Sequence, residues 1–98
     1  MFTIEEIKQK AVPIAKKYGV KKFSLFGSYA RGDADEKSDV DFIFNGGNGQ
    51  IKSYFNYLDF VFDLEDEFKC HVDLISEGIS DKDFLEEIKN DEVILYEG

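Results

Sequence analysis

The stretch FGSYARGDADEKSDVDFIF, residues Phe26–Phe44, contains the clearest structural pattern in this chain. It begins at the end of a short apolar run, Lys22–Phe26, which predicts a β-strand. From Asp39 to Phe44 acidic and apolar residues alternate, and this period of two predicts a second strand with one face toward a core. The residues between, Gly27–Ser38, are rich in Gly, Asp and Ser. They predict a turn, with at most one helical turn, followed by a polar loop.

The alternation places Asp39 and Asp41 on the same face of the second strand. The apolar residues on the opposite face are Val40, Phe42 and Phe44. Later, the run His71–Ile75 (HVDLI) predicts another strand, on which Asp73 also faces away from the apolar residues. If the two strands are neighbours, three carboxylates converge and repel one another, and a hard cation such as Mg²⁺ would relieve that repulsion. An Asp-x-Asp pair can also simply decorate a solvated strand end.

The pair Gly27-Ser28 follows the first predicted strand directly. A glycine there lets the backbone approach an anionic ligand closely, and Ser28 adds a hydroxyl beside the free amides of the turn. This arrangement suits a phosphate group. Taken alone, the pair also fits an ordinary turn and helix cap.

The rest of the chain supplies three helices and one more strand. Helical spacing predicts a helix over Ile4–Tyr18 and a long one over Ile51–Lys69. A short helix carries Phe84, Leu85 and Ile88, and Val93–Tyr96 predicts a last strand. The order of elements predicts one α/β (α+β) domain over residues 1–98, with a small mixed β-sheet and helices packed on one side.

Composition and charge exclude several classes of protein. The 98 residues are 43% hydrophobic, which excludes a disordered chain. The net charge of −9 excludes direct nucleic-acid binding through a general basic surface and favours a basic protein partner, or a ligand that arrives with metal ions. The single Cys70 predicts a reducing, cytoplasmic compartment, and no apolar run is long enough to predict a membrane span.

The helix predicted over Ile51–Lys69 has an unusually broad apolar surface. Its apolar arc is centred on Tyr54, Leu58 and Val61, and flanked by Tyr57, Phe60 and Leu64 on one side and by Phe55 and Phe62 on the other. One side of a sheet covers only a stripe of about 100°. We therefore expect at least two of these five flanking side chains, with Tyr57, Phe60 and Leu64 favoured, to stay partly exposed and to contact another chain, either a second copy or a different protein. The alternative is a thicker core.

The pair Gly27-Ser28 is followed, after ten residues, by Asp39-Val40-Asp41. This combination resembles the signature of the DNA polymerase beta-like nucleotidyltransferase superfamily. The whole stretch Phe26–Phe44 resembles the minimal nucleotidyltransferases, the MNT family. HVDLI is similar to that family's strand bearing a third carboxylate, and the C-terminal FLEEIKNDEVILYEG is similar as well. The resemblance covers nearly the whole chain and implies a polymerase-beta-like nucleotidyltransferase core.

The resemblance also implies roles for individual residues. Gly27 and Ser28 would hold the β- and γ-phosphates of a nucleoside triphosphate, most simply ATP. Asp39 and Asp41 would bind two Mg²⁺ ions, and Asp73 would complete the ion nearer the acceptor hydroxyl and help to deprotonate that hydroxyl. The implied reaction is in-line attack on the α-phosphate with loss of pyrophosphate.

Two further residues have two interpretations each. Arg31 matches the Ala-Arg-Gly of the family and would contact phosphate, or else form a structural salt bridge. His71 is the only histidine and shares a strand face with Asp73. Either His71 lies near the site, or it is an exposed structural histidine.

The resemblance finally implies a partner. MNT proteins of this type resemble the antitoxin half of toxin–antitoxin pairs, in which AMP is transferred from ATP to a tyrosine of a HEPN-family ribonuclease toxin. The chain length leaves no room for a separate acceptor-binding domain. Two alternatives remain open: a toxin-binding module without catalysis, and a stand-alone enzyme acting on a small hydroxyl compound. A homo-oligomer is compatible with all three.

Overall fold

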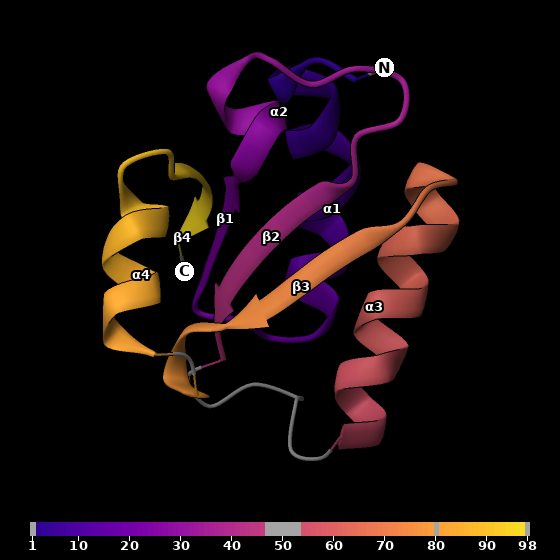
Figure 1. The fold of residues 1–98 in the computed structure, drawn as a ribbon. Coiled ribbons are helices and arrows are strands. Elements are labelled where there is room, and N and C mark those ends of the chain that lie inside the picture. Colours follow the sequence, from indigo (N-terminus) through magenta and orange to yellow (C-terminus); the bar gives the residue numbers. More distant parts are fainter. Residues whose placement is uncertain (1, 47–53, 80, 98) are drawn as a thin grey trace.

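The computed structural model describes residues 2–46, 54–79 and 81–97 (Figure 1). Its elements are α1 Ile4–Lys17, β1 Lys22–Phe26, α2 Gly27–Arg31, β2 Val40–Asn45, α3 Tyr54–Phe68, β3 Val72–Ser76, a 3₁₀ turn Glu77–Ile79, α4 Lys82–Lys89 and β4 Val93–Glu97. This order confirms the predicted succession of helices and strands. The turn after β1 forms the short helix α2, and the predicted start of α3 at Ile51 lies outside the described residues.

The four strands form one mixed sheet in the order β3-β2-β1-β4. β1 pairs antiparallel with both β2 and β4, whereas β2 and β3 are parallel. Parallel neighbours need a crossover connection, and α3 lies in the crossover between β2 and β3. Figure 1 shows α1 and α3 on the same side of the sheet and α4 beside β4 at the opposite edge.

The core between the sheet and α1 and α3 is largely aromatic. Phe23 of β1 stacks on Phe42 of β2 with ring centroids 4.7 Å apart. Phe60 of α3 stacks on Tyr18, at the end of α1, with centroids 4.8 Å apart. Val40 and Phe42 are fully buried, as the alternation of β2 predicts. Stacked rings of this kind fix the position of β2, and with it the face that carries its aspartates.

The predicted exposure along α3 is wrong for two of its three residues. Phe60 and Leu64 are 0% exposed, and only Tyr57 is partly exposed. The stripe that packs on the sheet and α1 runs through Phe60, Leu64 and Phe68, at positions i, i+4 and i+8. Apolar residues occur almost all round this helix, so periodicity alone does not determine its rotation.

The exposed apolar surface of α3 instead comes from three other residues. Phe55 is 77% exposed, Tyr54 69% and Phe62 59%. Phe55 and Phe62 are seven residues apart and therefore lie on the same side of the helix. Asp59 and Asp66, each four residues after one of these Phe residues, are exposed on that side as well. None of the helices in the described ranges is both long and apolar enough to span a membrane.

Side chains of α3 cover the outer edge of β3, the strand at one end of the sheet. The Tyr57 hydroxyl donates a hydrogen bond to the carbonyl oxygen of Leu74. The Val72 N–H donates to Glu65 Oε2 at 3.2 Å. Because these are groups that an additional strand would use, α3 satisfies part of the hydrogen bonding of this edge.

Candidate active site

Strand register brings the predicted site residues to one end of the sheet. In the parallel pair Asp41 of β2 lies opposite Asp73 of β3. The Val40 N–H donates to the His71 carbonyl oxygen at 3.2 Å, which extends the pairing to the residue before β3. In the antiparallel pair Phe26, the last residue of β1, lies opposite Asp41. The turn that begins at Gly27 therefore starts directly beside the aspartates.

The Asp41 carboxyl holds its proton more tightly than an ordinary carboxyl group does. The pKa of Asp41 is raised from 3.8 to about 7, first by burial, then by its hydrogen bond to Asp73, and then by the negative charges of Asp73 and Asp39. The hydrogen bond that raises this pKa runs from the protonated Asp41 carboxyl to Asp73. Carboxylates this close cannot all be ionised at low energy unless a cation compensates them.

Gly27 lies in contact distance of the Asp41 carboxylate. Its φ of +76° is in the left-handed region, which glycine adopts without strain. A Cβ added at Gly27 would be 2.3 Å from Asp41 Oδ2, closer than any real contact. Glycine is therefore required here for two reasons: its backbone conformation is left-handed, and the Asp41 carboxylate packs directly against its Cα.

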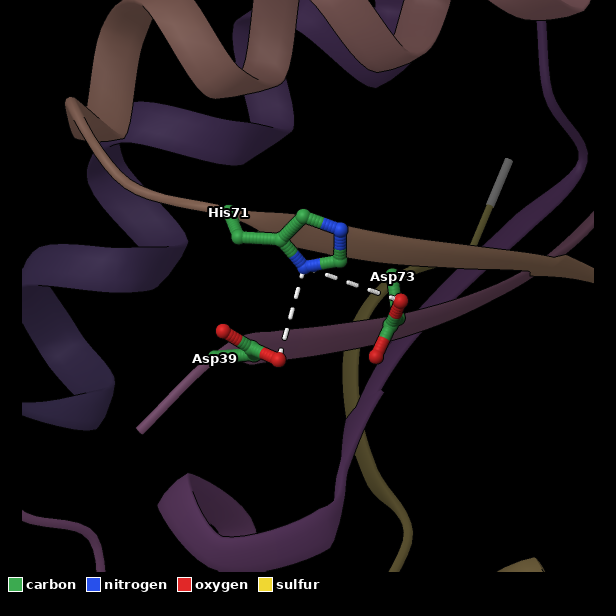
Figure 2. A group of neighbouring side chains, drawn as sticks. All are labelled: Asp39, His71 and Asp73. Atoms are coloured by element: carbon green, nitrogen blue, oxygen red, sulfur yellow. Dashed lines mark ion pairs between the residues drawn. The ribbon is translucent and has the colours of Figure 1, made fainter. Parts of the chain in front are cut away.

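Asp39, His71 and Asp73 form a second, more exposed part of the site (Figure 2). The His71 Nδ1 atom is 3.4 Å from Asp39 Oδ2 and 3.8 Å from Asp73 Oδ1. One ligand atom from each of the three residues lies within 4.8 Å of the other two. Of the two interpretations of His71, this geometry supports a position at the site, on an exposed side chain.

The loop that leads into Asp39 is held by its own polar groups. The Asp35 N–H donates to Ser38 Oγ at 2.9 Å, and the Lys37 N–H donates to Asp35 Oδ1 at 2.8 Å. Such turns between a side chain and a nearby backbone amide stabilise loops of this type. They set the direction in which the chain enters β2.

Arg31 makes ion pairs with Asp33 and Asp91, each at 3.3 Å. Its pKa is raised, most strongly by the hydrogen bond to Asp91. Asp91 is 60 residues away and lies before β4, so no local pattern indicates this partner. Of the two interpretations of Arg31, these pairs favour a structural salt bridge. The positive charge of Arg31 also offsets a small part of the rise in the pKa of Asp41. The predicted contact of Arg31 with phosphate stays a prediction.

The donor set suits a divalent cation. Asp39, Asp41 and Asp73 offer carboxylate oxygens, which Mg²⁺ prefers, and burial together with the negative charges of Asp73 and Asp39 raises the pKa of Asp41. Gly27 and half-buried Ser28 lie at the start of α2, where a phosphate would meet backbone amides. Together these groups can hold a phosphorylated ligand and its counter-ions.

We expect the metal-free protein to lose stability as pH rises from about 4 to about 7 through ionisation of Asp41. The folded protein holds this proton up to a pKa of about 7, whereas the unfolded chain releases it near 3.8, so the stabilisation present below 3.8 is lost by pH 7. Allowing for solvent screening at this half-buried group, the loss is about 1–2 kcal/mol. The measurement is urea unfolding in the presence of a chelator, over this pH range. It compares the free energy of unfolding of the wild type with that of Asp41→Asn. A difference that does not change with pH would contradict the raised pKa of Asp41.

Comparison with known proteins places these features in a family. A family model described as "Polymerase beta, Nucleotidyltransferase" matches residues 9–98. A protein of Methanocaldococcus jannaschii with the provisional name protein adenylyltransferase is 41% identical over 73 residues, which are 74% of this chain and 76% of that protein. The protein adenylyltransferase MntA of Thermococcus cleftensis is 33% identical over 79 residues, 76% of this chain and 78% of that protein.

Solved structures confirm the predicted fold. A structure described as a minimal nucleotidyltransferase has a TM-score of 0.78 at 22% identity and covers 94% of this chain and 95% of its own. A toxin–antitoxin crystal structure with AMP-PNP has a TM-score of 0.81 at 16% identity, covering 93% of this chain and 73% of its own. A third, of a tri-AMPylated HEPN toxin from Shewanella oneidensis in complex with an MNT antitoxin, has a TM-score of 0.75 at 14% identity and covers 96% and 72%.

Proposed function

This chain belongs to the polymerase beta nucleotidyltransferase family, and we propose that it transfers AMP from ATP to a hydroxyl group of an acceptor protein. The relatives named protein adenylyltransferases support both AMP as the transferred group and a protein as acceptor. The observation that carries the proposal is the convergence of Asp39, Asp41 and Asp73 beside the Gly27 turn. We also propose that residues 1–98 form a single nucleotidyltransferase domain.

Each site residue has a proposed role in binding ATP. Gly27 and Ser28 hold the β- and γ-phosphates through the backbone and hydroxyl of the turn. The position of this turn directly beside the Asp41 carboxylate, which packs against Gly27, supports this role. Arg31 contributes positive charge to the same region, since it lies close enough to lower the pKa of Asp41.

The aspartates would hold two Mg²⁺ ions and handle the acceptor proton. When bound, the ions supply positive charge that stabilises the attacking and leaving oxygens together. Asp39 and Asp41 would bind the ions from one strand face, and Asp73 would bind from the neighbouring strand. Asp73 accepts the proton of the acceptor hydroxyl while the oxygen of that hydroxyl forms a bond to the α-phosphorus of ATP. The bond from that phosphorus to pyrophosphate breaks, and pyrophosphate leaves.

The proposed acceptor is a tyrosine of a HEPN-family toxin, so that the protein acts as an antitoxin in the cytoplasm. The fold shared with the MNT antitoxin in complex with an AMPylated HEPN toxin supports this partner. The net charge of −9 suits a basic protein surface, and exposed Phe55 and Phe62 on α3 offer apolar contact area. Because a tyrosine hydroxyl is the nucleophile, transfer would modify the toxin covalently.

Incubation with ATP labelled at the α-phosphate tests the proposal. The protein is mixed with Mg²⁺ and either a candidate HEPN-family protein, a panel of small hydroxyl compounds, or buffer alone. We expect label on the HEPN protein that survives denaturing gel electrophoresis and is lost when its acceptor tyrosine becomes phenylalanine. Tight binding without label would instead establish a toxin-binding module, and label only on a small compound would establish a stand-alone enzyme.

A further inference from the structure

The arrangement of His71 with two aspartates matches the spacing of ligands around one ion. Its Nδ1 atom is 3.4 Å from Asp39 Oδ2 and 3.8 Å from Asp73 Oδ1 (Figure 2). Two ligands at about 2.1 Å from a common ion lie about 3.0 Å apart at a right angle and about 3.4 Å apart at the tetrahedral angle. The Asp39 distance lies in this range, the Asp73 distance is longer, and all three ligand atoms lie within 4.8 Å of one another, so these exposed side chains would move closer together to bind the same ion.

Asp73 lies on β3, and Asp39 and His71 directly precede the adjacent strands β2 and β3, so the sheet sets the positions of all three. The Val40 N–H binds the His71 carbonyl oxygen at 3.2 Å, which places Asp39 and His71 at the entrance to paired strands. Asp73 lies on the same strand face as His71 because side chains alternate along a strand. All three side chains are exposed, so an ion can reach them from solvent.

The chemistry of this set differs from that of carboxylates alone. Mg²⁺ prefers oxygen ligands, whereas Mn²⁺, Zn²⁺ and other transition metals also accept imidazole nitrogen. The geometry points to His71 as a metal ligand that, with Asp39 and Asp73, makes this site bind Mn²⁺ in preference to Mg²⁺. This inference rests on the proposed function in that Asp39 and Asp73 are metal ligands in both. It adds a nitrogen ligand and a different metal preference.

Metal titrations of the untagged protein test the preference. Mn²⁺ binding is followed by the loss of the free-ion electron paramagnetic resonance signal, and Mg²⁺ binding by competition. We expect His71→Ala to raise the dissociation constant for Mn²⁺ about tenfold or more, while that for Mg²⁺ changes less than about threefold. Asp59→Asn, which removes an exposed charge from α3, is the control and leaves both constants unchanged.

Pulsed electron paramagnetic resonance on the wild-type protein tests the ligand directly. Because the chain has one histidine, imidazole ¹⁴N modulation of bound Mn²⁺ can come only from His71. We expect that modulation, and its replacement by ¹⁵N modulation when histidine alone is ¹⁵N-labelled. Bound Mn²⁺ without imidazole modulation would overturn this inference and leave the proposed function standing. Failure of both metals to bind the wild-type protein, with and without ATP, would overturn the two together.

Discussion

Asp41→Asn is expected to lower the rate of AMP transfer by about 10³-fold or more while the protein stays folded. The substitution keeps the shape of the side chain but removes the charge that, in the proposed mechanism, holds Mg²⁺ and the triphosphate. It also removes a carboxyl group whose pKa is raised first by burial and then by its hydrogen bond to Asp73 and the charges of Asp73 and Asp39. The initial rate of label transfer from ATP at saturating Mg²⁺ measures the effect.

Two controls make this result specific. Asp59→Asn removes one exposed carboxylate from α3, and we expect it to retain the wild-type rate. Urea unfolding of Asp41→Asn in chelator should give a stability equal to or higher than that of wild type at pH 8, because a repulsive charge has gone. Full transfer activity in Asp41→Asn would show that the catalytic assignment of this residue is wrong.

Phe60→Ser is expected to reduce the free energy of unfolding by about 3–5 kcal/mol, as removal of a buried aromatic ring does in other proteins. Phe60 is fully buried and stacks on Tyr18, and its ring centroid is 5.7 Å from that of Phe23 and 5.5 Å from that of Phe44. The variant therefore opens a cavity where two helices meet the sheet. Chemical denaturation at constant pH measures the change.

The matched control lies two residues further along the same helix. Phe62 is 59% exposed, so Phe62→Ser should change the stability by less than about 0.5 kcal/mol. The same variant is expected to weaken binding of the proposed HEPN partner by about 1–3 kcal/mol if the Phe62 ring is central to that interface. Equal loss of stability in the two variants would contradict the observed rotation of α3.

The strands and the carboxylates were predictable because their pattern is local. Alternation with a period of two places Asp39 and Asp41 on one face of β2, and the register of β2 with β3 brings Asp73 opposite Asp41. The pairing of β2 with β3 is not visible in any local pattern. The resemblance of Phe26–Phe44 and HVDLI to one family supplied it, and the fold confirms it.

Features that depend on tertiary packing could not be predicted in this way. The rotation of α3 is decided by the fit of Phe60 and Leu64 against α1 and the sheet, because apolar residues surround the helix. The ion pair of Arg31 with Asp91 joins residues 60 positions apart. The contact of His71 with Asp39 depends on the parallel register, so the sequence left its role open between two interpretations.

The covering of the β3 edge by Tyr57 and Glu65 limits how this molecule can associate with others. An open edge strand is a template on which a second chain can add its own strand, and proteins with such edges are prone to aggregate. Here an incoming strand would have to displace a hydroxyl from Leu74 and a carboxylate from Val72. A protein that approaches this edge would therefore meet the side chains of α3 before it could pair with the backbone of β3.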